Sequence, residues 1–130
     1  MNDRARARPP CESARRHLEK QVTANPRDPR MRSSLGLMLA CLGLRDDAVR
    51  EARLAIDLEP VSTDAVNGPG YLNGLAGVYA LVGEEVAALD VLEKYMLLPG
   101  SVSTTQLRLD PIFASLRKHP RFQKLLELRH

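Results

Sequence analysis

The chain has 130 residues, about the length of one domain, and its 44% hydrophobic and 27% charged residues are typical of a globular protein rather than a collagenous, disordered or disulfide-rich one. It has three Tyr, two Phe and no Trp, so its core must consist mainly of Leu, Val and Ala, which favours helices over a β-sandwich. No stretch approaches the ~20 apolar residues that cross a bilayer, so we expect a soluble protein with no membrane partner.

Residues 1–10 are rich in arginine and proline, and no apolar segment of the kind found in signal peptides follows them. No aromatic side chains that could stack on bases accompany Arg4, Arg6 and Arg8, and the net charge of the chain is only +3, so we expect no nucleic-acid partner. The segment is therefore predicted to be a flexible basic tail.

Two cysteines, Cys11 and Cys41, are too few for a framework of disulfides, and no Cys/His cluster has the spacing of metal ligands. Cys41 falls in the apolar run LGLMLACLG, where a small buried residue is expected at a close contact between helices. The small number of cysteines thus predicts a cytoplasmic protein. Without a Cys/His cluster we expect no metal, and we expect no other cofactor.

A repeat begins in the first half of the chain. Pro26 and Pro60 each close an Ala-rich segment, and they lie 34 residues apart, which is the tetratricopeptide period. The pattern W-x2-L-G-x2-Y…A-x3-F…P is matched at Leu35, Gly36, Ala48 and Pro60. A helix, a turn and a second helix are therefore expected between the two prolines.

A second unit with the same pattern follows. Its matching residues are Leu72, Leu75, Ala76, Tyr79, Ala88 and Leu92. Gly43 and Gly83 are predicted to occupy the turns between the paired helices of the two units. Because Ala48 and Ala88 lie 40 residues apart, about six extra residues are expected between the units, within the turn-forming segment 61–69.

The C-terminal segment has a different pattern. Asp110-Pro111 and His119-Pro120 each predict the start of a short helix. We expect these helices to form a cap whose apolar residues cover the helix that carries Leu89, Leu92 and Met96; they are Phe113, Leu116, Phe122 and Leu125. The competing interpretation places the segment in the groove as an autoinhibitory ligand.

The expected organisation follows from these patterns. The tail at 1–10 precedes a half repeat at 11–28, a repeat at 29–62, a second repeat at 69–100 and the cap at 101–130. The half repeat lacks its first helix, so Leu18 and Val22 are expected to form an apolar edge that nothing caps.

No constellation points to catalysis. The three histidines, His17, His119 and His130, are expected to be solvated, because no organised partner surrounds them. Two acidic pairs, Asp46/Asp47 and Glu84/Glu85, fall in first turns, where the helix dipole accounts for them. Gly68-Pro69-Gly70 lacks the Lys-Ser/Thr of a phosphate loop. The chain is therefore not expected to be an enzyme.

The repeats resemble the tetratricopeptide repeat (TPR) family. The segments DAVNGPGYLNGLAGVYALVGE, ALDVLE and LRLDPIFASLRKHPRF are similar to the C-terminal repeat block of bacterial signalling proteins that also carry adenylate cyclase, Ser/Thr kinase or winged-helix regulator domains. The resemblance implies an all-α, TPR-like right-handed solenoid of antiparallel helix pairs with a short-helix cap. It also implies a scaffold that binds proteins and performs no catalysis.

Aligning the units assigns nine residues to a concave groove: Arg30, Ser33, Leu37, Ala40, Cys41, Asn73, Gly77, Ala80 and Leu81. Only Arg30 and Asn73 match the Lys, Asn and Arg of the family's carboxylate clamp, so binding of chaperone tails is not expected. The groove is predicted to bind a helix or an extended peptide of a protein partner. The alternative is a structural element that forms a homodimer through its N-terminal edge or its groove.

Overall fold

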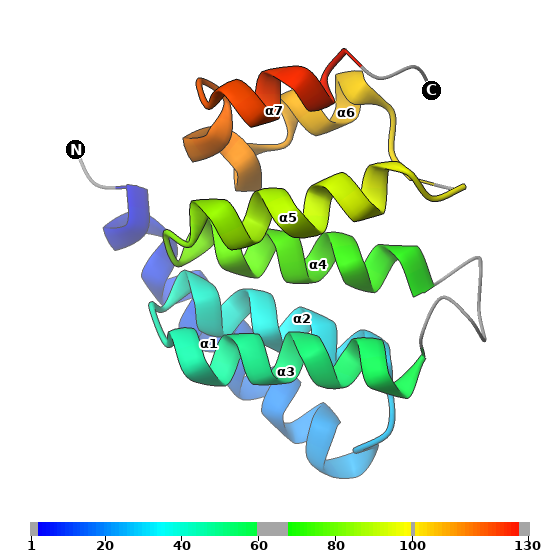
Figure 1. Cartoon of the computed structure of the whole chain (residues 1–130). Helices are drawn as coiled ribbons and strands as arrows, with labels where there is room; N and C mark the ends of the chain where they lie inside the picture. The colour runs from blue at the N-terminus through cyan, green and yellow to red at the C-terminus, as the bar shows by residue number, and fades with distance from the viewer. Residues whose placement is uncertain (1–2, 60–67, 100, 128–130) are drawn as a thin grey trace.

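The computed structural model describes residues 3–59, 68–99 and 101–127, and these residues form helices joined by turns (Figure 1). The helices are α1 (Asp3–Ala24), α2 (Pro29–Cys41), α3 (Arg45–Leu58), α4 (Gly68–Leu81), α5 (Glu85–Met96), α6 (Thr104–Leu109), the 3₁₀ helix η1 (Pro111–Leu116) and α7 (Pro120–Leu125). The predicted all-α class is confirmed. Within the described ranges, no helix has both the length and the apolar character that a membrane span requires.

Helix α1 begins at Asp3, so the prediction of a flexible tail over residues 1–10 is wrong from residue 3 onward. Ala and Arg, which dominate this segment, are among the best helix formers. The helix continues through Pro9 and Pro10, although each proline removes a backbone donor inside it. Leu18 and Val22 are partly buried and pack against the core, so the predicted open edge is partly covered by the chain itself.

Two helical hairpins, α2/α3 and α4/α5, follow with the same turn geometry. Gly43 and Gly83 have φ angles of 78° and 83°, a left-handed conformation that glycine adopts without steric cost. The next residues, Leu44 and Glu84, share φ −89° and ψ 73° at the start of the second helix. The predicted positions of the two turns are confirmed.

Burial repeats in the two hairpins with the same 40-residue spacing as the turns. The buried pairs are Leu35 and Leu75, Gly36 and Ala76, Leu39 and Tyr79, Ala40 and Ala80, Ala48 and Ala88, Ala52 and Leu92, and Ala55 and Tyr95. At Gly36 a Cβ atom would lie 3.1 Å from the carbonyl oxygen of Ala48, which shows how closely α2 and α3 approach. The chain therefore contains an internal helical repeat.

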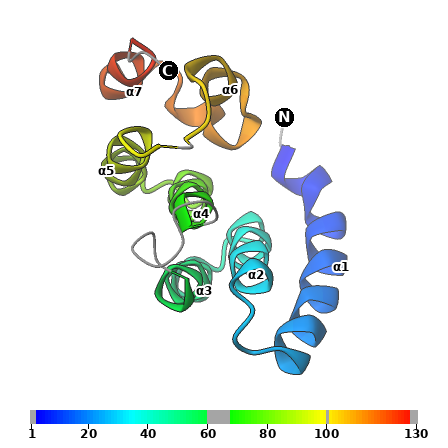
Figure 2. The same ribbon diagram turned by 90° about the vertical axis from the view of Figure 1, so that its right-hand side faces the viewer.

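The two hairpins stack side by side, because α4 packs on both α2 and α3 as well as on α5. Seen end-on in Figure 2, α2 and α4 form an inner layer, with α3 and α5 outside it. A guanidinium nitrogen of Arg53 donates to the hydroxyl of Tyr79 at 2.7 Å, and Arg45 pairs with Glu84 at 2.7 Å, so both bonds join the hairpins. Most of the predicted insertion at 61–69 lies outside the described residues. Its last two residues, Gly68 and Pro69, belong to α4.

Side-chain caps define the three short C-terminal helices. Ser103 and Gln106 form a reciprocal capping box at α6, and a carboxylate oxygen of Asp110 accepts a hydrogen bond from the backbone N–H of Ile112 at 3.0 Å. At α7 the Nδ1 atom of His119 accepts from the backbone N–H of Arg121 at 3.2 Å. His119 is therefore a helix cap and not the solvated side chain that the sequence predicted.

The predicted burial of the cap is confirmed. The four apolar side chains named in the prediction lie in the core cluster that also contains Leu89, Leu92 and Met96; they are Phe113, Leu116, Phe122 and Leu125. Helix α7 packs on α5 as expected, but η1 packs on α4 of the inner layer. Arg121 also fixes α7 to α5 through Asp90 and Glu93, at 2.7 and 2.8 Å.

Candidate functional site

The nine groove residues predicted from the repeats all lie on α2 and α4, which pack against each other. We call this surface the inner face; it consists of Arg30, Ser33, Leu37, Ala40, Cys41, Asn73, Gly77, Ala80 and Leu81. Ala40, Gly77 and Ala80 are buried, so these three residues serve the packing of the helices. The side chain of Arg30 is 75% exposed and pairs with Asp28 at 3.3 Å. The other five residues are partly exposed.

The centre of the inner face is covered by the chain's own C-terminal segment. A Cβ atom at Gly77 would lie 3.1 Å from Cγ2 of Ile112 and 3.2 Å from Cδ2 of Leu37. These two side chains thus fill the space that Gly77, which has no side chain, would otherwise leave for a ligand in the predicted groove. The C-terminal segment therefore caps the array and also lies against the inner face. Ile112 was not among the predicted residues, although its position after Asp110-Pro111 marks it as part of η1.

Asn73 lies one helical turn before Gly77 and is partly buried on α4. Its side-chain oxygen Oδ1 is fully buried and has no hydrogen-bond partner among the described residues. A buried acceptor without a donor costs roughly 1 to 3 kcal/mol. The inner face therefore contains one polar atom that an additional N–H donor would stabilise.

A polar cluster lies near the exposed Arg30. The hydroxyl of Tyr71 donates to Oε2 of Glu59 at 3.2 Å. Burial, together with this hydrogen bond, raises the pKa of Tyr71 to about 12, so its hydroxyl stays protonated at neutral pH. The pairing with Asp28 raises the pKa of Arg30 and thus stabilises its charge. The cluster therefore offers hydrogen-bonding groups beside the inner face.

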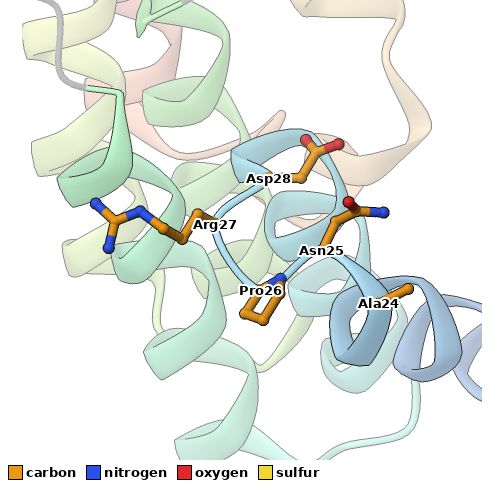
Figure 3. A pocket seen from close by; sticks show the side chains of 5 residues that line it. All are labelled: Ala24, Asn25, Pro26, Arg27 and Asp28. Atoms are coloured by element: carbon orange, nitrogen blue, oxygen red, sulfur yellow. The ribbon is translucent and has the colours of Figure 1, made fainter.

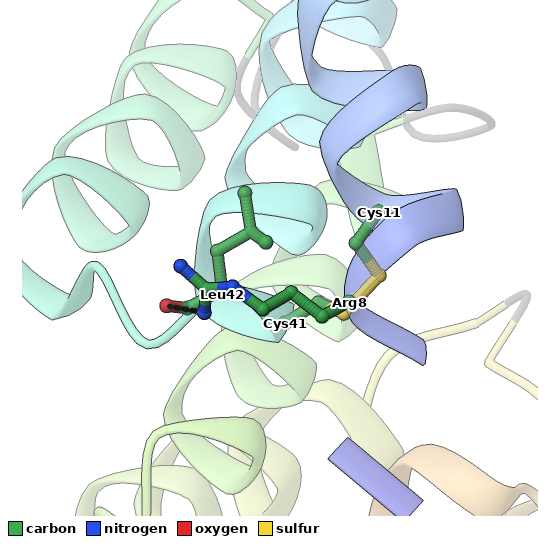
Figure 4. Close-up of a disulfide and its surroundings, with 4 residues drawn as sticks. All are labelled: Arg8, Cys11, Cys41 and Leu42. Carbon is green, nitrogen blue, oxygen red and sulfur yellow. Dashed lines mark hydrogen bonds between the residues drawn. A yellow bond between two sulfur atoms is a disulfide. The ribbon is translucent and has the colours of Figure 1, made fainter. Parts of the chain in front are cut away.

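Cys11 and Cys41 form a disulfide, with their Cα atoms 6.3 Å apart (Figure 4). The prediction that Cys41 is a small buried residue at a close helix contact is therefore wrong, since it is partly exposed and bonded to Cys11. The two meet because α1 lies along α2 and brings its own residue 11 to the C-terminal end of α2. Beside the bond, a guanidinium nitrogen of Arg8 donates to the carbonyl oxygen of Leu42 at 3.5 Å. The pairing removes the observation from which a reducing cytoplasm was inferred, since disulfides are rare there.

The other residues that the sequence analysis considered for chemistry are the possible metal ligands, the histidines and the acidic pairs. Within the described ranges, no group of three or more His, Cys, Asp or Glu side chains is arranged to hold a metal. His17 is exposed, and His130 lies outside the described residues. Of the acidic pairs, Asp46 and Asp47 lie in the first turn of α3, and Arg45 bonds Asp46 at 2.8 Å.

Three surface hollows belong to single segments of the chain. One of about 410 Å³ is lined by residues 24–28 in the turn between α1 and α2 (Figure 3). Another, of about 500 Å³, is lined by residues 43–47, and a third of about 440 Å³ by four side chains of α1. Pockets that bind small molecules usually have convergent polar groups from several elements, so these hollows are weak candidates.

Comparison of the chain with protein-family models, with curated proteins and with solved structures finds no match.

Proposed function

We propose that the chain is a non-catalytic interaction module, a TPR-like right-handed solenoid that binds a helix or an extended peptide of a partner protein on its inner face. The observation that supports this best is the repeated hairpin. Two hairpins with the same turn geometry and the same buried positions bring α2 beside α4, with partly exposed side chains of both on one surface. A repeat that stacks in this way offers an extended surface that suits a polypeptide better than a small molecule.

The chemistry of the partly exposed residues suits a peptide. Leu37 and Leu81 offer apolar contacts, and Ser33 offers a hydroxyl. The Oδ1 atom of Asn73 is buried and lacks a donor, so a peptide N–H reaches it only where the ligand displaces the side chains that cover it. Ile112 already covers part of this surface, so a ligand must either bind beside it or displace it.

The test is selection of a peptide from a displayed library by the full chain, followed by affinity measurements on variants. Leu37→Glu should weaken the selected peptide at least about tenfold, or roughly 1.4 kcal/mol. The matched control is Lys94→Glu on α5, an exposed position in the outer layer, which should leave the affinity unchanged. Enrichment of no peptide, or equal weakening by both variants, contradicts the proposal.

The second candidate is self-assembly through the N-terminal edge. It is supported by Leu18 and Val22 of α1, which are only partly buried, so a second copy could cover the rest of these two side chains. Sedimentation velocity over a wide range of concentrations tests it. A concentration-dependent dimer supports assembly, and a strict monomer at every concentration contradicts it.

A further inference from the structure

We propose that the Cys11–Cys41 disulfide is a redox-controlled latch that holds the N-terminal half of α1 against α2, and that a thiol reductant releases this half while the two hairpins stay folded. The proposal goes beyond peptide binding and does not depend on it. It rests on a difference in packing between α1 and the other long helices, which are attached through buried side chains.

The attachment of α1 depends little on buried side chains. Each of the helices α2 to α5 contributes at least four buried residues, whereas no described side chain of α1 is fully buried. Its partly buried contacts with the core, Leu18 and Val22, lie in its C-terminal half. Toward the N-terminus, the disulfide and the hydrogen bond from Arg8 to Leu42 join α1 to the end of α2.

The N-terminal half of α1 is also weak as a helix. Pro9 and Pro10 lack the N–H groups that would hold the preceding turn. The ion pairs of Arg15 join it to Glu12 and Glu19 of the same helix and not to α2. With the disulfide open, this half is therefore expected to separate from α2 at little cost, in the way that marginal segments open locally.

A reductant can reach the disulfide, since Cys11 and Cys41 are both partly exposed. A thiolate of a low-molecular-weight thiol attacks one sulfur, the Cys11–Cys41 bond breaks, and the other cysteine leaves as a thiolate that takes up a proton. A second thiolate attacks the mixed disulfide, releasing the first cysteine and forming the disulfide of the reductant. The protein gains two electrons and two protons, and two thiols are oxidised.

Release changes the inner face itself, because Cys41 is one of its residues. The disulfide holds α1 against the C-terminal end of α2 at this position. Opening the latch therefore uncovers α2 around Cys41, so the redox state of the pair decides whether that end of α2 is covered.

Hydrogen exchange on the full chain tests the latch. Reduction with dithiothreitol should speed exchange in residues 11–17 at least roughly tenfold and leave that of α5 unchanged. Cys11→Ser should exchange fast without reductant and should not respond to it, while the matched α1 control Ser13→Ala should behave like the wild type.

Three results overturn the proposal. Unchanged exchange in residues 11–17 on reduction would mean that packing alone holds α1. Equally faster hydrogen exchange in α5 would mean that the disulfide stabilises the whole fold, and circular dichroism would then show a loss of helix on reduction. Two titratable thiols in the untreated protein would mean that the latch does not form.

Discussion

Gly36 lies where α2 and α3 come closest, and its replacement by alanine tests the packing of the first hairpin. A Cβ atom there would lie 3.1 Å from the carbonyl oxygen of Ala48 and 3.2 Å from the backbone nitrogen of Ala52. Both neighbours are backbone atoms and cannot rotate away, so the two helices must separate. Gly77 differs, because its neighbours at similar distances are the flexible ends of Leu37 and Ile112.

The magnitude follows from two opposing effects. Alanine stabilises a helix interior by about 1 kcal/mol relative to glycine. Overpacking by one methyl group costs up to about 3 kcal/mol, and rigid neighbours favour the upper end of that range. Gly36→Ala should therefore lower the free energy of unfolding by about 1 to 2 kcal/mol, which lowers the thermal midpoint by roughly 3 to 10 °C in a chain of this size.

The assay is a thermal melt followed by circular dichroism, with Gly70→Ala as the control. A Cβ atom at Gly70 meets no described atom within 4 Å, so its midpoint should stay the same or rise slightly. A Gly36→Ala variant as stable as the wild type would refute the close contact between α2 and α3.

Three further predictions concern stability. Phe122 is fully buried, so Phe122→Ala should cost about 3 to 5 kcal/mol in urea unfolding, and a loss under 1 kcal/mol would contradict its place in the core. Arg32 pairs with the buried Glu51 at 2.8 Å, so Arg32→Ala should cost about 3 kcal/mol, whereas an unchanged urea midpoint would show that Arg50, 3.9 Å from the same carboxylate, is enough to neutralise Glu51. The pKa of Tyr71 is raised from 10.0 to about 12, so its contribution to the free energy of unfolding is complete below pH 10 and is lost as the pH rises toward 12. Tyr71→Phe should flatten this decline in stability between pH 10 and pH 12. An equally steep decline in the variant would contradict the role given to Tyr71.

The turns, the helix starts and the buried helix faces could be predicted from the sequence because they depend on residues close together in the chain. Gly43 and Gly83 mark turns because few other residues adopt a positive φ, and the proline after Asp110 marks a helix start that the structure contains. The spacing of apolar residues predicted which faces are buried, including those of the C-terminal cap. Each of these features depends on residues a few positions apart.

The remaining features depend on how distant segments approach one another. The pairing of Cys11 with Cys41 requires the register of α1 along α2, which no local pattern contains. The contact of Ile112 with Gly77 requires η1 to cross back onto α4, although the sequence predicted that the segment covers α5. The nine predicted inner-face residues lie on neighbouring helices, but side chains from other parts of the chain decide which of them are accessible.

Methyl NMR of the full chain with a library-selected peptide decides whether the inner face of α2 and α4 binds a peptide. Binding on this face should shift the methyl signals of Leu37, Leu81 and Ile112. The methyl signals of Val86 and Leu97, which are 62% and 77% exposed at the two ends of α5, should not shift. Shifts confined to Val86 and Leu97, with the inner-face methyl groups unchanged, would contradict binding on this face.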